Sequence, residues 1–132
     1  MYQEIKTQKD IQNFLEKTNQ LHDGYVISVK YNNNGIKKTE LGHSISPWKT
    51  TLSLQVLVTS LYDTIVELEF ECLYEWQFKE EYFNSACGIF EVSLSFDSQG
   101  HIIWADDVWQ NTTDMKTCSY VIAESVKWRI VE

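Results

Sequence analysis

The chain has 132 residues, of which 43% are hydrophobic and 14% aromatic, and its formal net charge is −8. This length fits one domain with a single core, so residues 1–132 are treated as one domain. With five Gly, one Pro and three Cys, the composition excludes a disordered tail, a collagen-like chain and a disulfide miniprotein. The negative charge argues against nucleic acid or an anionic membrane as partner.

Targeting and redox features predict a cytoplasmic protein. The first residues, MYQEIKTQKDIQNF, are too polar for a signal peptide, and no apolar run approaches the roughly 18 residues of a membrane span. An odd set of cysteines, Cys72, Cys87 and Cys118, favours reduced thiols.

The N-terminal part has helical periodicity, and the rest of the chain has the period of strands. Residues 7–21 predict one helix, with Thr7 and Asp10 at the spacing of a capping box. Asn32–Gly35 predicts a tight turn from which 36–39 returns as a weak strand, and 42–47 is predicted to be a loop. The remaining strands are predicted at 25–31, 51–60, 66–78, 90–96, 101–105 and 119–131.

No helix is predicted between the strands, which argues against parallel crossovers. The expected fold class is α+β, in which the N-terminal helix is followed by a curved, mostly antiparallel sheet or partly open barrel of six to seven strands. The segment 66–78 is long for one strand, so we expect a bulge or bend within it.

The negative charge is concentrated in residues 67–107, which carry ten acidic residues against Lys79 alone. Strand alternation directs the apolar residues of 66–78 inward and the carboxylates outward. The outward set is Glu67, Glu69, Glu71 and Glu75, with Glu91 on the polar face of the next strand. One explanation is a solvated face that pairs with Lys127 and Arg129 of the last strand. The other is a docking surface for a basic protein.

The tryptophans and tyrosines divide into strand and loop groups. Tyr74, Trp76, Tyr120 and Trp128 have core parity in their strands and are predicted to pack inside. Trp48, Trp104 and Trp109 lie in or near loops, where they either pack inward or present an aromatic contact surface. Trp104 and Trp109 therefore join the outward carboxylates as candidate partner-binding residues.

A second group of residues is a candidate structural motif or pocket. His22, Asp23 and Gly24 join the helix to the first strand, and either form a structural turn or supply a metal ligand pair or a general base. His101 and Asp106 are the further residues that such a pocket would need. No HExxH, CxxC, GxSxG or phosphate-binding glycine loop is present, so no catalytic residue, metal or cofactor is assigned.

The stretch Leu21-His22-Asp23-Gly24-Tyr25-Val26-Ile27-Ser28-Val29 resembles the opening of a set of small bacterial proteins. In that set an aromatic residue or Leu precedes His-Asp, a small residue follows, and a strand comes next. Looser likeness extends to 66–70, 102–106 and 121–130. Some of these proteins are uncharacterised domains, and others are immunity proteins that neutralise a toxin. The resemblance implies a compact bacterial cytosolic domain without known catalysis.

Three functions follow from these features. The leading hypothesis is a non-catalytic, immunity-like protein that binds a basic protein such as a toxin through the acidic face and the loop tryptophans. The alternative is an enzyme or small-ligand-binding domain with a pocket around His22, Asp23, His101 and Asp106. The third is a dimerising module in which an outer strand pairs with its twin. The sequence leaves the oligomeric state open.

Overall fold

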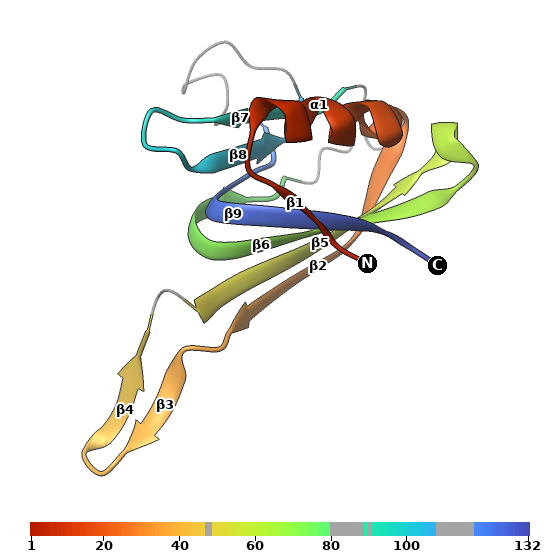
Figure 1. The fold of residues 1–132 in the computed structure, drawn as a ribbon. Coiled ribbons are helices and arrows are strands. Elements are labelled where there is room, and N and C mark those ends of the chain that lie inside the picture. Colours follow the sequence, from red (N-terminus) through yellow and green to blue (C-terminus); the bar gives the residue numbers. More distant parts are fainter. Residues whose placement is uncertain (47–48, 80–88, 90, 108–117) are drawn as a thin grey trace.

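The computed structural model describes residues 1–46, 49–79, 89, 91–107 and 118–132 (Figure 1). Its only regular helix in these ranges, α1, spans Gln8–Lys17, and 3-10 turns occupy Asn19–Leu21 and Thr59–Leu61. The strands are β1 (Gln3–Ile5), β2 (Gly24–Asn33), β3 (Ile36–Thr39), β4 (Gly42–Ile45), β5 (Thr50–Val58), β6 (Thr64–Gln77), β7 (Ser93–Phe96), β8 (Ile102–Ala105) and β9 (Tyr120–Val131).

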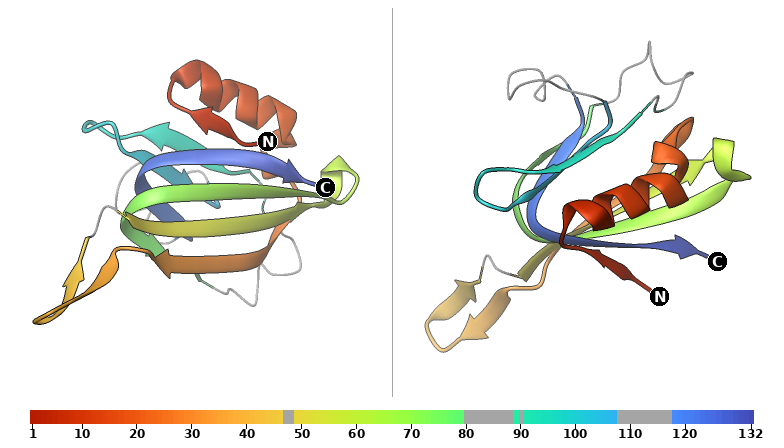
Figure 2. Two further views of the ribbon diagram at one scale, coloured as in Figure 1. Left: turned by 60° about the horizontal axis from the view of Figure 1, so that its bottom comes forward. Right: turned by 45° about the horizontal axis from the view of Figure 1, so that its top comes forward.

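Seven strands form one strongly curved sheet in the order β2-β5-β6-β9-β8-β7, and β1 pairs with the later part of β9 (Figures 1 and 2). Every strand pair is antiparallel, so the expected antiparallel sheet is confirmed. The sheet does not close into a barrel, because β2 and β7 lie at its opposite ends. β1 was not predicted.

The helix covers the sheet with its Ile11 and Phe14 side. The predicted capping box is present, with the Asp10 amide donating to Thr7 Oγ1 (3.2 Å) and the Thr7 amide donating to the Asp10 carboxylate (3.0 Å). Phe14 is fully buried and meets Trp128 of β9 edge to face, at 5.2 Å between ring centroids. This contact fixes the helix over the core.

The helix is shorter than the predicted 7–21. It ends at Lys17, and Asn19, Gln20 and Leu21 all have positive φ, between 53° and 57°. A left-handed backbone cannot continue an α-helix, so the last turn is replaced by the 3-10 turn. Leu21 nevertheless reaches the core, where it is fully buried.

The expected bend in the long strand occurs at Cys72. Up to Phe70, the inward residues of β6 are buried as predicted. Cys72 then has a φ of 57°, and the register with β9 shifts between Leu73 and Glu75. This irregularity changes the face that Tyr74 occupies. Tyr74, predicted to pack inside, is therefore 57% exposed. Trp76 lies opposite the buried Val121 and so keeps its predicted core-side face, but it is nevertheless 39% exposed.

The other two aromatic residues predicted to pack inside, Tyr120 and Trp128, are buried. The prediction for the final strand is thus confirmed at these positions.

A second, two-stranded sheet projects from the end of β2 (Figure 1). The predicted weak strand over 36–39 is present as β3, but it pairs with β4 rather than with β2, and the hairpin turn lies at Glu40 and Leu41. The prediction of a loop over 42–47 is wrong for β4. Gly35 is needed where β2 ends, since a Cβ there would lie 2.0 Å from the Ser46 carbonyl oxygen.

Candidate functional site: the charged and aromatic faces of the sheet

The predicted acidic face is present on the outer side of β6, and two basic residues of β9 form ion pairs with three of its carboxylates. In the strand register, Glu67 lies opposite Arg129 and Glu69 lies opposite Lys127. Lys127 Nζ is 3.2 Å from a Glu69 oxygen and 3.3 Å from a Glu71 oxygen. The predicted pairing with the last strand is therefore confirmed.

Glu67 is the most completely engaged of these carboxylates and is only 7% exposed. It accepts hydrogen bonds from Tyr2 Oη (2.7 Å), Gln55 Nε2 (3.0 Å) and Arg129 Nε (2.7 Å). Burial raises the pKa of Glu67, but these three donors outweigh burial and hold the pKa below its usual value. Glu67 is thus a structural carboxylate and is poorly placed to meet a partner.

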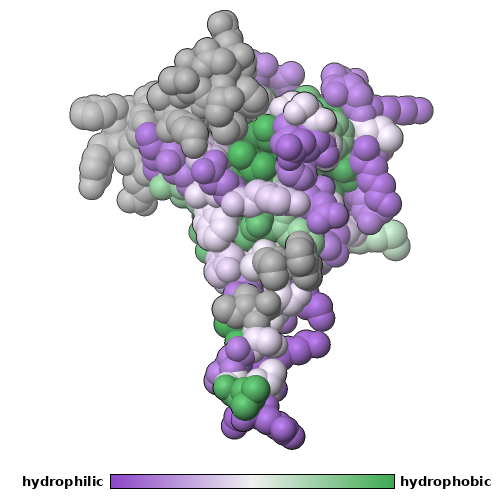
Figure 3. All heavy atoms as spheres, turned by 90° about the vertical axis from the view of Figure 1, so that its left-hand side faces the viewer, coloured by the Kyte–Doolittle hydropathy of each residue, from purple (hydrophilic) through white to green (hydrophobic). Residues whose placement is uncertain are grey.

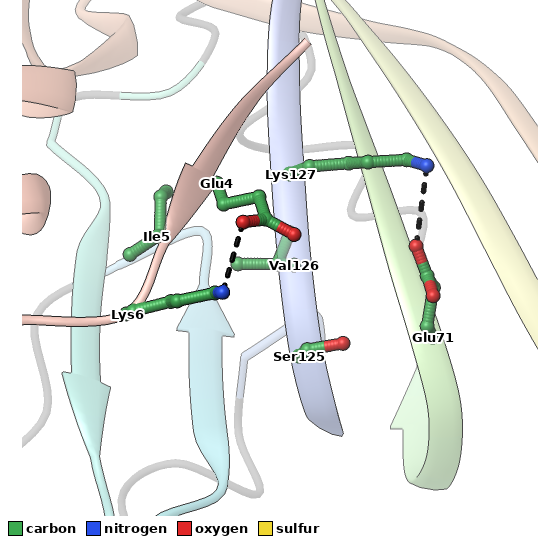
Figure 4. Close-up of a pocket in the computed structure, with 7 residues that line it drawn as sticks. All are labelled: Glu4, Ile5, Lys6, Glu71, Ser125, Val126 and Lys127. Carbon is green, nitrogen blue, oxygen red and sulfur yellow. Dashed lines mark ion pairs between the residues drawn. The ribbon is translucent and has the colours of Figure 1, made fainter.

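The charged face continues into a pocket between β1 and β6 that crosses β9 (Figure 4). Its lining residues are Glu4, Ile5, Lys6, Glu71, Ser125, Val126 and Lys127. Two ion pairs occupy it, Glu4 with Lys6 (3.0 Å) and Glu71 with Lys127. Each charged side chain that lines the pocket is paired with one of opposite sign, so the pocket does not favour a ligand of either charge.

The remaining partner-binding candidates are dispersed. Glu75 is exposed and hydrogen-bonds to Tyr120, whose pKa is raised by burial and by this carboxylate. Glu91 is half-buried, and Trp109 lies outside the described residues. For Trp104 the inward-packing alternative is confirmed, because it lies within β8 opposite Val121 and is fully buried. Trp104 therefore cannot contact a partner at the surface.

His22, Asp23 and Gly24 form a tight corner at the start of β2. The Asp23 amide donates to the Ile89 carbonyl (2.7 Å), and the Asp23 carbonyl accepts from Thr59 Oγ1 (2.8 Å). A Cβ on Gly24 would lie 2.6 Å from the Leu21 carbonyl oxygen, so glycine is required by close approach. These contacts support the structural interpretation of the motif. The hydrogen bonds that hold the corner are made by the main-chain amide and carbonyl of Asp23.

The pocket proposed around this motif is not assembled. His22 Nε2 lies 3.6 Å from Asp23 Oδ2. His101 instead pairs with Asp97, at 3.2 Å between Nδ1 and Oδ2, and its ring stacks on Tyr74. Asp106 accepts from the Ser119 amide (3.0 Å). His101 and Asp106 flank opposite ends of β8, about 16 Å apart along an extended strand. Within the described ranges, no group of three His, Cys, Asp or Glu residues could hold a metal ion.

Asp106 and Cys72 are the other titratable groups that the sequence singled out. Burial raises the pKa of Asp106 despite the Ser119 hydrogen bond. Burial and a hydrogen bond to Glu124 raise the pKa of the Cys72 thiol, which disfavours the reactive thiolate. Cys72 and Cys118 are thiols that are not joined in a disulfide.

An apolar surface that sequence reasoning missed lies where the core ends, between β5 and β2. Val29 and Tyr31 lie opposite Leu54 and Leu52, so they face the core side of the sheet. The two leucines are fully buried, but Val29 and Tyr31 are 42% and 44% exposed. Trp76 of β6 stacks on Tyr31, with ring centroids 4.9 Å apart and planes 20° apart. We call Val29, Tyr31 and Trp76 the aromatic surface.

The signal for this surface was present but ambiguous. The alternation of β2 shows an apolar face, and only the strand order shows that β2 is an edge strand whose apolar face α1 does not cover. Trp76 has the core-side parity that the sequence predicts, and its exposure is seen only in the folded chain, where it lies against the exposed Tyr31.

Comparisons with known proteins leave the family open. No family model matches the chain, and searches of curated proteins and of solved structures return no match. No helix in the described part of the chain is long and apolar enough to cross a membrane.

Proposed function

We propose that this chain is a non-catalytic protein-binding domain of the bacterial cytoplasm, and that its partner docks on the aromatic surface. The observation that carries the proposal is the exposed stack of Tyr31 on Trp76. Large aromatic side chains at the centre of an interface supply much of the binding energy at low entropic cost. The immunity-like role implied by the opening residues is one form of this function, with a toxin as the partner.

The charges have a separate part in this proposal. A net charge of −8 attracts a basic protein over long range and speeds the encounter. Glu67, Glu69 and Glu71 already have basic neighbours, so breaking their ion pairs to dock a partner would cost free energy. The short-range contacts are therefore assigned to the aromatic surface rather than to the acidic face.

The test is a titration against a candidate toxin, such as the protein encoded beside this one. We expect Trp76→Ala to weaken binding about 30-fold, which is the loss of one interface hot spot. Tyr62→Ala is the matched control, because Tyr62 is an aromatic residue that is 98% exposed beyond the Thr59–Leu61 turn. Tyr62→Ala should change the dissociation constant less than about twofold. Equal losses in the two variants, or none in Trp76→Ala, would show that the aromatic surface is not the contact.

A further inference from the structure

Positive charge is gathered in one segment of this acidic protein, and its central part, with Lys37, Lys38 and Glu40, projects from the body as a hairpin. Residues 30–49 contain four lysines and one glutamate, a net charge of +3, while the rest of the chain carries −11. The β3–β4 hairpin, which we call the basic arm, holds the exposed Lys37 and Lys38 and projects from the body (Figure 3). Figure 3 shows a mostly hydrophilic arm with a hydrophobic tip, and Leu41 in its turn is fully exposed.

The strand that leads into the arm is at the edge of the sheet. β2 is the first strand of the order, and among the described residues only Ile89 pairs with its open side, at Gly24. Ile27 occupies a bulge, which leaves Ser28–Asn33 as a regular stretch. Lys30 is the one charged side chain in β2. Such an edge exposes main-chain donors and acceptors that can pair with another strand.

The opposite end of β2 is acidic. Asp23 directly precedes the strand, and Asp63 follows the Thr59–Leu61 turn, in which Thr59 donates a hydrogen bond to the Asp23 carbonyl. Both aspartates are exposed, and we call them the acidic corner. The edge of β2 thus runs from an acidic corner to a basic arm, which is the layout that a two-fold axis makes self-complementary.

The spacing along the chain agrees with this symmetry. A two-fold axis keeps each residue on the same face in both copies, so the antiparallel pair must be centred on a residue. If it is centred on Tyr31, Asp23 and Lys38 lie eight and seven residues from the centre, and each basic arm would pass near the acidic corner of the other copy. Lys30 would then lie opposite Asn32 rather than a second Lys30, which avoids opposed like charges.

We propose that two copies of this chain pair antiparallel through the edges of their β2 strands, with the basic arm of each copy against the acidic corner of the other. The two sheets would become one continuous sheet. This proposal uses the main chain of β2 and the arm, and is independent of the partner docking proposed above.

The test is a charge swap measured by sedimentation equilibrium. The full-length chain should dimerise. Variant A, Lys37→Glu with Lys38→Glu, makes the arm acidic, so that it would repel the acidic corner of the other copy. Variant B, Asp23→Lys with Asp63→Lys, makes the corner basic, so that it would repel the basic arm. We expect each alone to dimerise at least about tenfold more weakly than the natural chain. Mixing A with B should restore the dimer, because both ends then carry opposite charges.

Matched controls change the same charges on surfaces away from β2. Lys9→Glu with Lys17→Glu, and Glu4→Lys with Glu16→Lys, replace exposed residues of α1 and β1 and should leave dimerisation unchanged. In amide hydrogen exchange, Ser28–Asn33 should gain protection as the natural chain is concentrated. A monomeric natural chain, variants that dimerise as it does, or a mixture of A and B that stays monomeric would overturn the proposal.

Discussion

Removing the Glu67 side chain should destabilise the fold far more than removing its neighbour Glu69. Glu67 is 7% exposed and holds three donors from three separate elements, Tyr2, Gln55 and Arg129. Hydrogen bonds to a charged acceptor contribute about 1 kcal/mol each after a discount for the solvent that reaches Arg129, whose side chain is 39% exposed. We therefore expect Glu67→Ala to lower the free energy of unfolding by about 3 kcal/mol.

Glu69→Ala is the control, because it removes a neighbouring carboxylate that lacks the three hydrogen bonds of Glu67. Glu69 and Lys127 have side chains that are 25% and 31% exposed, so Glu69→Ala should cost less than about 1 kcal/mol. Urea unfolding, monitored by tryptophan fluorescence, measures both stability changes, because Trp104 and Trp128 are buried in the folded protein and become exposed on unfolding. Equal costs for the two variants would refute the assignment of Glu67 as the structural carboxylate.

The pH dependence gives a second check on the same residue. The pKa of Glu67 is lower in the folded protein than its usual 4.5, so its stabilising contribution is complete above pH 4.5 and is lost as pH falls through the lowered pKa. The stability difference between the natural chain and Glu67→Gln should shrink over that acid range. A difference that stays constant from pH 7 to about pH 2 contradicts the role of the ionised form.

Three other changes test the local structure by urea unfolding. Asp106→Asn should stabilise the protein at pH 7, because burial raises the pKa of Asp106 above its usual 3.8 and so the ionised form disfavours folding. The gain in stability should vanish below pH 3.8, and a loss of stability at pH 7 would contradict this reasoning. Gly24→Ala should cost about 2 kcal/mol, since its Cβ would lie 2.6 Å from the Leu21 carbonyl oxygen, and a neutral result would mean that the corner is not tight. Thr7→Ala should cost about 1 kcal/mol by removing the helix cap, and an unchanged midpoint would count against the capping box.

The regular parts of the fold could be predicted because their patterns are periodic. The alternation of Val66, Leu68 and Phe70 with glutamates specifies one buried face, and these three residues are fully buried in the folded chain. The pairing of Glu67 with Arg129 was also predictable, because outward residues of two strands can meet once the strands are neighbours.

The features that the sequence did not predict depend on single backbone conformations and on strand order. A left-handed Cys72 reverses the exposure expected of Tyr74. The sequence left open whether Trp104 packs inward or lies at the surface, and its burial depends on the pairing of β8 with β9. The separation of His101 from Asp106 was already implied by the predicted strand 101–105, because residues five apart on a strand lie far from each other.

The most direct test of the proposed function compares two dissociation rates from the same immobilised toxin candidate. Trp76→Ala should dissociate about 30-fold faster than the natural chain, because it removes the exposed aromatic contact. Glu69→Gln with Glu71→Gln should change the dissociation rate less than about threefold, because these carboxylates are paired with Lys127. The reverse order, with the carboxylate variant released quickly and Trp76→Ala held as tightly as the natural chain, would place the contact on the acidic face and contradict the proposal.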